Sequence, residues 1–469
     1  MRLILRATLT AALAAVVATP LLFPEPVSAQ FGGRGGGRGG RGQADPNLPG
    51  EPTAVTPATL SQEVTGPGAM YQSVQSLPPG RGLDHHGYEA KEYWATGTAA
   101  GEPYKTRIVV RRPRDNGRFS GLVFAEAMHP SGSAHIFEYT SEYSMQSGHI
   151  AIEIVTSGLN NLTDANAARY ADIAATGAQT NEILAQVGAA VREGSNSPLA
   201  GLTIRKMVLG GTSATAAILI NYLPAHMVYR TPAMRHVYDG FMPHGTGATV
   251  QRIDVPLIEV PTMREVAPGN ASARQDSDEP GNQFRQYEFA GMAHVDSRDS
   301  VRFKPDPCVR PVSSLPLQAY LSVALDHLFA WVDEGVVPPR SPRVLVDRNT
   351  ANDGSLMALD AVGNPLGGVR NPYVDVATAT HGPVNEAKNP VIPNPSAYIR
   401  AGGQAAANQM CGLAGYMVPF SKAKLRELYG SKESYVRQVR AKLDEMEAAR
   451  WSLPVYREMI LGDAGKVEF

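Results

Sequence analysis

Cysteine is nearly absent from this sequence of 469 residues, which has only Cys308 and Cys411. No cysteine and histidine cluster has the spacing of a zinc site, so a structural zinc domain is excluded. The adjacent pair His85 and His86 has no third ligand nearby and makes a weak metal site. The glycine patterns that bind dinucleotides or phosphates are also missing. We therefore expect a protein that needs no metal and no cofactor.

Long hydrophobic runs are missing after the first residues. Leu9 to Leu22 is apolar, follows Arg2 and Arg6, and precedes the small residues Val27-Ser-Ala29. This order is typical of a secretory signal over residues 1–29. The alternative is an uncleaved membrane anchor, but the run is shorter than the roughly 20 residues needed to span a bilayer. We expect a secreted or periplasmic protein without a stable membrane anchor.

An excess of one charge is lacking too, because the 43 basic residues nearly balance the 44 acidic residues and the net charge is -1. This balance gives no electrostatic reason to expect a nucleic-acid partner. Residues 31–42 are Arg-Gly repeats, a composition that can bind nucleic acid. Export favours a flexible tether, and the Pro-rich stretch that follows extends it, so we predict a disordered linker over residues 30–62.

Residues 63–469 remain for the folded part, enough for one large core or two domains. In an oxidising compartment Cys308 and Cys411 could form a disulfide that closes a loop of about 100 residues. The alternative is two buried free thiols. We expect the disulfide.

Strand-like and helix-like segments alternate through the middle of the chain. The strand candidates are residues 106–112, 121–125, 149–155, 206–210, 238–242, 256–260 and 284–289. Thr176 and Gln179 form a capping box before a helix, and Ser314 opens another helix that ends at Gly335. This alternation predicts an α/β fold with a mostly parallel, doubly wound sheet. Residues from about 340 to 420 are irregular and predict a cap or wrapping segment, and residues 421–461 predict C-terminal helices.

The most informative stretch lies around Ser213. The apolar residues Met207 to Leu209 enter a Gly211-Thr-Ser213-Ala-Thr215 corner, and a helix of small residues follows. A strand, a sharp turn and a helix with serine at the apex form the nucleophile elbow of α/β-hydrolases. Thr215 stands where the usual pattern has its second glycine.

A serine nucleophile needs an imidazole base and an orienting carboxylate, which follow it in that order in this fold. His294, in the small-residue loop Ala290-Gly-Met-Ala-His294, follows the last predicted strand and is the expected base. Glu265 follows the strand at 256–260 and is the expected acid. The competing acids are Asp276 and Asp278 in a later polar loop, and Asp254 and Glu259 in or before the strand.

The oxyanion hole needs two backbone N–H donors. One is expected from Ala214, the residue after the serine. The other is expected from the loop after residues 121–125, where Pro130 has no N–H and Met128, His129 and Ser131 are candidates; we choose His129. His244 also follows a strand and could line the pocket.

Several short motifs in order resemble a family of bacterial secreted α/β-hydrolase domain proteins related to carboxylesterases. The resemblance runs from Tyr88 to about Leu461, and its motifs are Tyr88–Gly97, Tyr104–Pro113, the elbow, Tyr238-Asp-Gly240, Ala290–His294, Asn364–Arg370 and Cys411-Gly-Leu. It implies an α/β-hydrolase fold and a Ser-acid-His triad that includes Ser213 and His294. In the acid segment the family has a Glu-x-Asp pair, where this chain has Met263 and Glu265.

These observations predict an exported serine hydrolase that cleaves a small-molecule carboxylic ester with a Ser213-Glu265-His294 triad. An amidase or peptidase with the same triad remains open, because pocket shape decides the leaving group. A non-catalytic binding protein with this fold is the third reading.

Overall fold

The computed structural model describes residues 50–469, except for residues 76, 270, 272, 299, 301–302, 348–354 and 392–396. The predicted signal at 1–29 and most of the predicted linker lie outside the described residues. The described chain forms one compact unit. Among these residues no helix is both long and apolar enough to cross a bilayer.

A sheet of nine strands forms the centre of the described chain, in the order β11-β10-β9-β7-β5-β6-β4-β3-β2. From β6 to β11 every neighbouring pair is parallel, and the pairs that join β6, β4, β3 and β2 are antiparallel. The strands are β2 (Thr59–Leu60), β3 (Tyr88–Ala99), β4 (Glu102–Pro113), β5 (Leu122–Ala127), β6 (Ile150–Ile154), β7 (Lys206–Thr212), β9 (Gly240–His244), β10 (Leu257–Glu259) and β11 (Phe284–Gln286). The mostly parallel sheet predicted from the sequence is confirmed.

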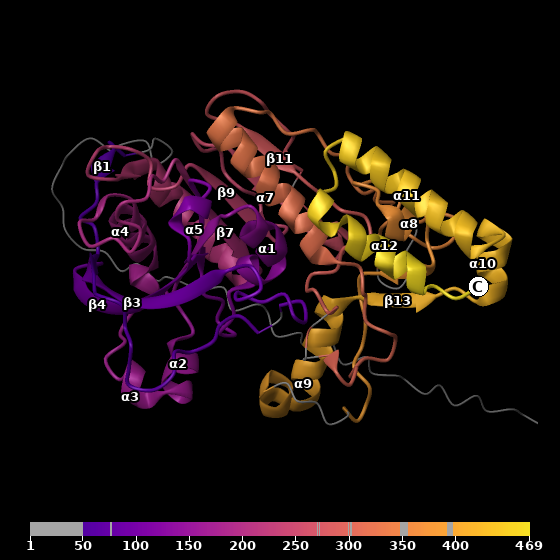
Figure 1. Ribbon diagram of the computed structural model, residues 1–469, viewed down its shortest axis with the longest axis horizontal. Coiled ribbons are helices and arrows are strands. Elements are labelled where there is room, and N and C mark those ends of the chain that lie inside the picture. The colour runs from indigo at the N-terminus through magenta and orange to yellow at the C-terminus, as the bar shows by residue number, and fades with distance from the viewer. Residues whose placement is uncertain are drawn as a thin grey trace, which may run out of the picture. The chain divides into compact units, whose positions relative to one another are not determined.

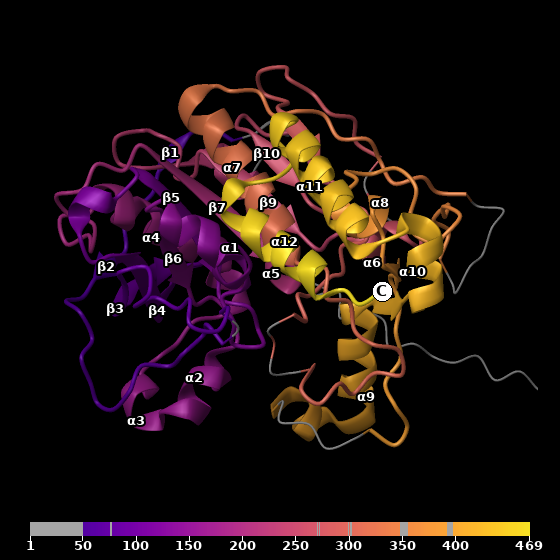
Figure 2. The ribbon, with the colours of Figure 1, turned by 45° about the vertical axis from the view of Figure 1, so that its right-hand side comes forward.

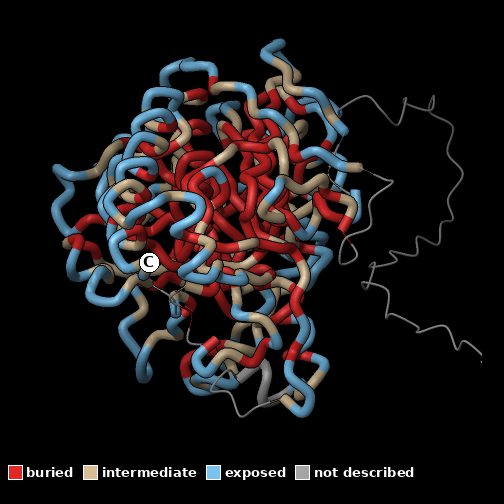
Figure 3. Tube along the Cα trace, turned by 90° about the vertical axis from the view of Figure 1, so that its right-hand side faces the viewer, coloured by how far each residue is buried: buried red, intermediate tan, exposed pale blue. Residues whose placement is uncertain are grey.

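Helices cover both faces of this sheet (Figure 1). One core joins the sheet to α4 (Thr180–Glu193) and α5 (Ala214–Val228). The other core joins it to α1 (His135–Gln146) and α7 (Leu317–Glu334). Figure 3 shows the buried residues gathered in the middle of this unit, with exposed residues around them. Parallel strands buried on both faces need continuous apolar runs, and β5 and β6 are buried at every position.

The predicted elements lie close to the observed ones, and the boundary of the linker needs correction. The structure pairs β1 (Thr53–Ala54) with β8 (Tyr229–Arg230), and β2 with β3 at the edge of the main sheet. Leu60 is buried in the core of the α4 and α5 face. The prediction of a disordered linker up to residue 62 is therefore wrong for residues 53–60, because their hydrogen-bond partners lie far away in the sequence.

The C-terminal third wraps around the α7 side. It contains α8 (Pro372–Asp375), β12 (Ala379–Gly382), α9 (Ala397–Ala414), β13 (Tyr416–Pro419), α10 (Lys422–Tyr429), α11 (Lys432–Ala448) and α12 (Arg457–Lys466). Figures 1 and 2 show α11 and α12 beside α7, and their buried side chains share its core. Cys308 and Cys411 form a disulfide that ties α9 to the segment before α7.

The shorter helices are α2 (Leu159–Ala165), α3 (Ala167–Tyr170) and α6 (Met263–Val266).

Glu259 of β10 is an acidic side chain inside the sheet. It is fully buried, and neither of its carboxylate oxygens has a hydrogen-bond partner among the described residues. Its neighbour in β11 is Gln286, whose side-chain oxygen also lacks a partner. Burial raises the pKa of Glu259 to about 8. Glu259 is therefore protonated at neutral pH.

This raised pKa predicts a stability that falls with pH. Below about pH 4.5 the carboxyl is protonated in both states, and between about pH 4.5 and 8 only the unfolded chain releases its proton freely. The free energy of unfolding then falls by up to about 1.4 kcal/mol per pH unit. We expect Glu259→Gln to melt at the native temperature near pH 4 and above it at pH 8 to 9. Thermal denaturation over this range checks the prediction, with the exposed Glu51→Gln as control. Parallel curves for Glu259→Gln and the native protein would contradict it.

Candidate active site

Ser213 lies in the turn between β7 and α5. Its φ is 55° and its ψ is -115°, a left-handed backbone conformation that residues other than glycine rarely adopt. Such strain persists only where the surrounding structure enforces it, and it gathers at functional sites. Gly211 is required because a Cβ there would lie 2.4 Å from the carbonyl oxygen of Thr215. The predicted strand, turn and helix around the serine are present as a tight elbow.

Thr215 explains why this elbow works without its second glycine. The Thr212 N–H donates to the Thr215 hydroxyl at 2.8 Å, and this hydroxyl donates to the Thr212 carbonyl at 2.9 Å. Thr215 is buried, so these two hydrogen bonds satisfy its polar atom and close the turn on both sides of Ser213. At this position a glycine would contribute backbone flexibility, whereas Thr215 holds the turn through its two side-chain hydrogen bonds.

His294 and Glu265 form a hydrogen-bonded pair near the ends of two neighbouring strands. His294 follows β11, Glu265 lies in α6 after β10, and the His294 Nδ1 donates to Oε1 of Glu265 at 2.8 Å. This bond fixes the proton on Nδ1, so the lone pair of the neutral ring is on Nε2. Nε2 is buried and has no partner in the described part of the chain. His294 therefore presents a free basic nitrogen, as a general base requires.

Thr262 holds the Glu265 carboxylate in place. Its N–H and its hydroxyl both donate to Oε2, at 2.9 and 2.6 Å, in a capping box at the start of α6. Burial raises the pKa of Glu265, but His294 and the hydrogen bonds from His294 and Thr262 outweigh burial and lower it to about 2. Glu265 is thus ionised over the whole working range of pH. The spacing Thr262-x-x-Glu265 is itself a capping-box signal in the sequence.

The end of β9 lies between Ser213 and His294 and contacts both. The Ser213 N–H donates to the His244 carbonyl at 2.9 Å, and Gly245 follows with a φ of 62°. A Cβ at Gly245 would lie 2.8 Å from Cε1 of His294. Only glycine fits this left-handed position against the imidazole. Ser213, Glu265 and His294 therefore all follow the carboxyl ends of strands between β7 and β11.

Three of the four competing acids are paired elsewhere, and the fourth is buried in the sheet. Asp276 accepts hydrogen bonds from the Gln286 N–H and from Arg343, and Asp278 forms ion pairs with Arg285 and Arg340. Asp254 bonds to His226 at 2.9 Å, and Glu259 points into the sheet core without a partner among the described groups. The structure brings Glu265, and none of these four, to His294.

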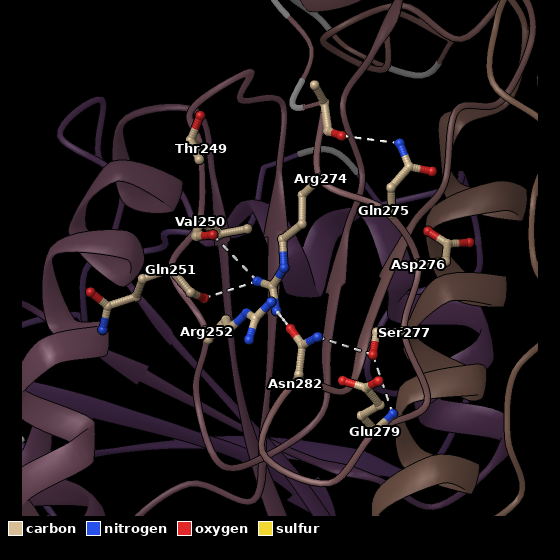
Figure 4. Close-up of a pocket in the computed structure, with 11 residues that line it drawn as sticks. Thr249, Val250, Gln251, Arg252, Arg274, Gln275, Asp276, Ser277, Glu279 and Asn282 are labelled. Carbon is tan, nitrogen blue, oxygen red and sulfur yellow. Dashed lines mark hydrogen bonds between the residues drawn. The ribbon is translucent and has the colours of Figure 1, made fainter.

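A cavity of about 720 Å³ lies beside this polar loop. Its lining comes from the segments after β9 and before β11 and includes Asp276 but no triad residue. Figure 4 shows the Arg274 guanidinium directed at the carbonyls of Val250 and Gln251 and at Asn282. These contacts already occupy the guanidinium, and we assign no ligand to this cavity.

The expected first oxyanion donor, Ala214, lies at the start of a helix. Ala214 is exposed and is the first residue of α5, so its N–H has no acceptor within the helix. The positive end of the helix dipole also points at the serine.

The expected second donor does not fit this geometry. The His129 N–H donates to the Ser133 carbonyl at 2.9 Å, and the Met128 N–H donates to Ile154 across the sheet. The Ser131 N–H donates to Nδ1 of His129. Because all three N–H groups have acceptors within the protein, we no longer assign His129 as the second donor. The loop after β5 can be predicted from the sequence, but the sequence does not show which of its N–H groups donate to acceptors within the protein.

The His244 ring lies between His294 and α1. Its ring centroid is 6.4 Å from that of His294 and 6.2 Å from that of Tyr139 in α1. Tyr139 stacks on His135, and His135 contacts His129. Burial lowers the pKa of His244 to about 3, so this imidazole is neutral. The structure shows His244 next to His294 and Tyr139. The contact with α1 could not be predicted, because helical spacing alone does not show which loop a helix faces.

Helix α9 contacts His294 and Arg264, the neighbour of Glu265. The His294 N–H donates to the carbonyl of Leu413 in α9, and Arg264 donates to the carbonyl of Gly412 at 3.0 Å. Both acceptors follow Cys411 of the disulfide. The disulfide therefore anchors the part of α9 that positions the histidine loop.

His226, His236 and Asp254 are close enough together to hold a metal ion. They lie at the end of α5 that is remote from Ser213, and Arg230 already contacts the Asp254 carboxylate at 3.3 Å. A neighbouring guanidinium disfavours a cation, and we assign no metal to this group.

Residues 54–461 match the sequence profile of the alpha/beta hydrolase domain family. No curated protein matches this sequence. Among solved structures, the esterase Est22 is 10% identical over 38% of this chain and 64% of its own, with a TM-score of 0.27. The esterase from the archeon Pyrobaculum calidifontis is 14% identical over 33% of this chain and 45% of its own, with a TM-score of 0.22. The chain thus spans less than two thirds of either protein.

LpqC, a poly(3-hydroxybutyrate) depolymerase from Bordetella parapertussis, is 10% identical over 55% of this chain and 92% of its own, with a TM-score of 0.30. Scores and identities this low carry no argument about the reaction, which has to come from the site itself.

Proposed function

Because this chain belongs to the alpha/beta hydrolase domain family, we propose that it is a serine hydrolase that cleaves carboxylic esters with Ser213, His294 and Glu265. One observation carries the proposal. A serine with a φ of 55° stands at the carboxyl edge of the sheet, where a His294–Glu265 pair leaves its Nε2 free. A strained serine, a free imidazole nitrogen and an ionised carboxylate are the parts that acyl transfer requires.

The first half of the reaction forms an acyl-enzyme. Ser213 Oγ attacks the ester carbon while Nε2 of His294 takes the hydroxyl proton, and Glu265 stabilises the imidazolium through Nδ1. The oxyanion accepts a hydrogen bond from the Ala214 N–H. His294 then returns its proton to the leaving alkoxide, which departs as an alcohol.

In the second half, water attacks the acyl carbon and gives a proton to Nε2. The intermediate collapses, the serine leaves with that proton, and the carboxylic acid is released. In free enzymes the bond between nucleophile and base is often long and tightens only with substrate. The free Nε2 of His294 agrees with such a resting state.

The proposal includes export. The sequence of residues 1–29 and the pairing of Cys308 with Cys411 support an oxidising compartment. The substrate would then be an ester outside the cytoplasm.

A fluorophosphonate probe tests the reaction class. We expect the probe to label the native protein at Ser213, as shown by mass spectrometry of the peptide that carries residues 207–230, and Ser213→Ala to remain unlabelled. Ser131→Ala, in the neighbouring loop, serves as the control that keeps the label. Absence of labelling in the folded native protein would favour a non-catalytic binding protein. Cleavage of anilides at rates equal to esters would favour an amidase.

A further inference from the structure

Two buried polar side chains next to the nucleophile have no hydrogen-bond partners. Thr212 is the last residue of β7 and His244 is the last residue of β9, and the two are paired in the parallel ladder. Thr212 is 2% exposed and His244 is 0% exposed. The Thr212 hydroxyl and both ring nitrogens of His244 lack partners in the part of the chain that the structure describes. Buried polar groups in proteins are nearly always hydrogen bonded, so three such atoms side by side call for an explanation.

Both side chains lie on the face of the sheet that packs against α1. Side chains alternate along a strand, and paired residues of neighbouring strands share a face. Val208 faces the α1 core, and a Cβ at Gly210 would lie 3.1 Å from Ile136 of α1. Thr212 continues this series toward α1. His244 lies on the same side, because its ring contacts Tyr139 of α1 edge to face.

These two side chains are neighbours of Ser213 and His294. Ser213 follows Thr212 directly, and its N–H donates to the His244 carbonyl at 2.9 Å. The rings of His244 and His294 are 6.4 Å apart. A substituent one or two carbons from an ester carbonyl held at Ser213 would therefore come close to the Thr212 hydroxyl and the His244 ring.

The chemistry of these two groups selects the kind of substituent. Burial keeps His244 neutral, so its ring offers one N–H donor and one lone pair. The Thr212 hydroxyl also donates and accepts. Neither group carries a charge that would offset a carboxylate or an ammonium, and an alkyl chain would leave all three atoms unsatisfied. A hydroxyl group, which donates and accepts through one atom, matches both partners.

We propose that Thr212 and His244 form a hydrogen-bonding subsite for a hydroxyl group on the acyl chain, so that the preferred substrates are esters of hydroxy acids. This inference rests on the proposed ester hydrolysis. The subsite positions the acyl chain, while the bond-making steps stay with the triad. Sites built to hydrogen-bond a substrate hydroxyl discriminate strongly against analogues without it, because their own polar groups are then left unpaired.

The test compares three methyl esters that share one leaving group: butyrate, 2-hydroxybutyrate and 3-hydroxybutyrate. Acid release is followed in a pH-stat, and each kcat/KM is divided by the rate constant for hydroxide-catalysed hydrolysis of that ester. In the native protein we expect one hydroxybutyrate to exceed butyrate at least about tenfold. We expect this ratio to fall toward one in His244→Leu and in Thr212→Val.

Thr156→Val is the matched control, because the Thr156 hydroxyl is also buried and unpartnered but follows β6, two strands away from β7. It should keep the native ratio. A ratio near one in the native protein would overturn the subsite even if neither variant folds, and so would an unchanged ratio in both folded variants. If the native protein hydrolyses none of the esters and the fluorophosphonate leaves Ser213 unlabelled, the proposed function itself fails.

Discussion

Replacing Ser213 with alanine is expected to abolish ester hydrolysis while leaving the fold intact. The variant removes only the hydroxyl, and its backbone can keep the hydrogen bond from residue 213 to the His244 carbonyl. Loss of a triad nucleophile costs on the order of 10⁴-fold or more in kcat, because no hydroxyl oxygen is left to attack the acyl carbon. Hydrolysis of a short-chain nitrophenyl ester measures the loss, with circular dichroism to check the fold.

A Ser213→Gly variant sharpens this test. It should be equally inactive, but it should melt at a higher temperature than Ser213→Ala, since glycine adopts a φ of 55° at little cost. Retention of most of the esterase activity by either folded variant would show that Ser213 is not the nucleophile.

The second large effect is expected for Glu265→Gln. The amide oxygen can still accept from Thr262, but the amide N–H₂ then faces the Nδ1–H of His294. To avoid two opposed donors, the imidazole must move its proton to Nε2, the atom that has to accept the serine proton. Activity at neutral pH should fall by roughly a thousandfold or more, as when a triad aspartate is replaced by asparagine. Raising the pH should not restore it, because glutamine has no charge to recover.

Asp276→Asn and Asp278→Asn are the controls for this variant. Asp276 is tied to Arg343 and Asp278 to Arg285 and Arg340, so their loss should lower the melting temperature and leave kcat close to native. The three variants are compared only after their melting curves show that each is folded. A silent Glu265→Gln beside an inactive Asp276→Asn or Asp278→Asn would move the acid to the later loop.

Local patterns were enough to predict several central strands and two helix boundaries. The strand predictions for β5, β6, β7 and β10 lie within two residues of the observed bounds. The predicted capping box of Thr176 and Gln179 is present before α4, and the predicted end at Gly335 is the C-cap of α7 with a φ of 70°. These features depend on residues a few positions apart, and physical rules for turns and caps act at that range.

The two wrong predictions, the linker boundary and the second oxyanion donor, concern contacts between residues that are far apart in the sequence or depend on how a loop closes. Residues 53–60 read as a linker from their composition, yet they pair with strands that lie more than thirty residues away in the sequence. The second oxyanion donor was misassigned because the hydrogen bonds of His129 and Met128 to Ser133 and Ile154 depend on how the loop closes against the sheet. Composition and periodicity contain no information about such pairing.

The α/β fold and the elbow at Ser213 could be predicted from the sequence, because they depend on residues that are neighbours along the chain. The tertiary structure was needed to show which of five acids lies against His294, since Glu265 and His294 are joined through the adjacent ends of β10 and β11. It alone also set Thr212 beside His244, two residues far apart in sequence that the parallel register of β7 and β9 makes neighbours. Register is fixed when both faces of the sheet are buried, and that is a property of the packed molecule.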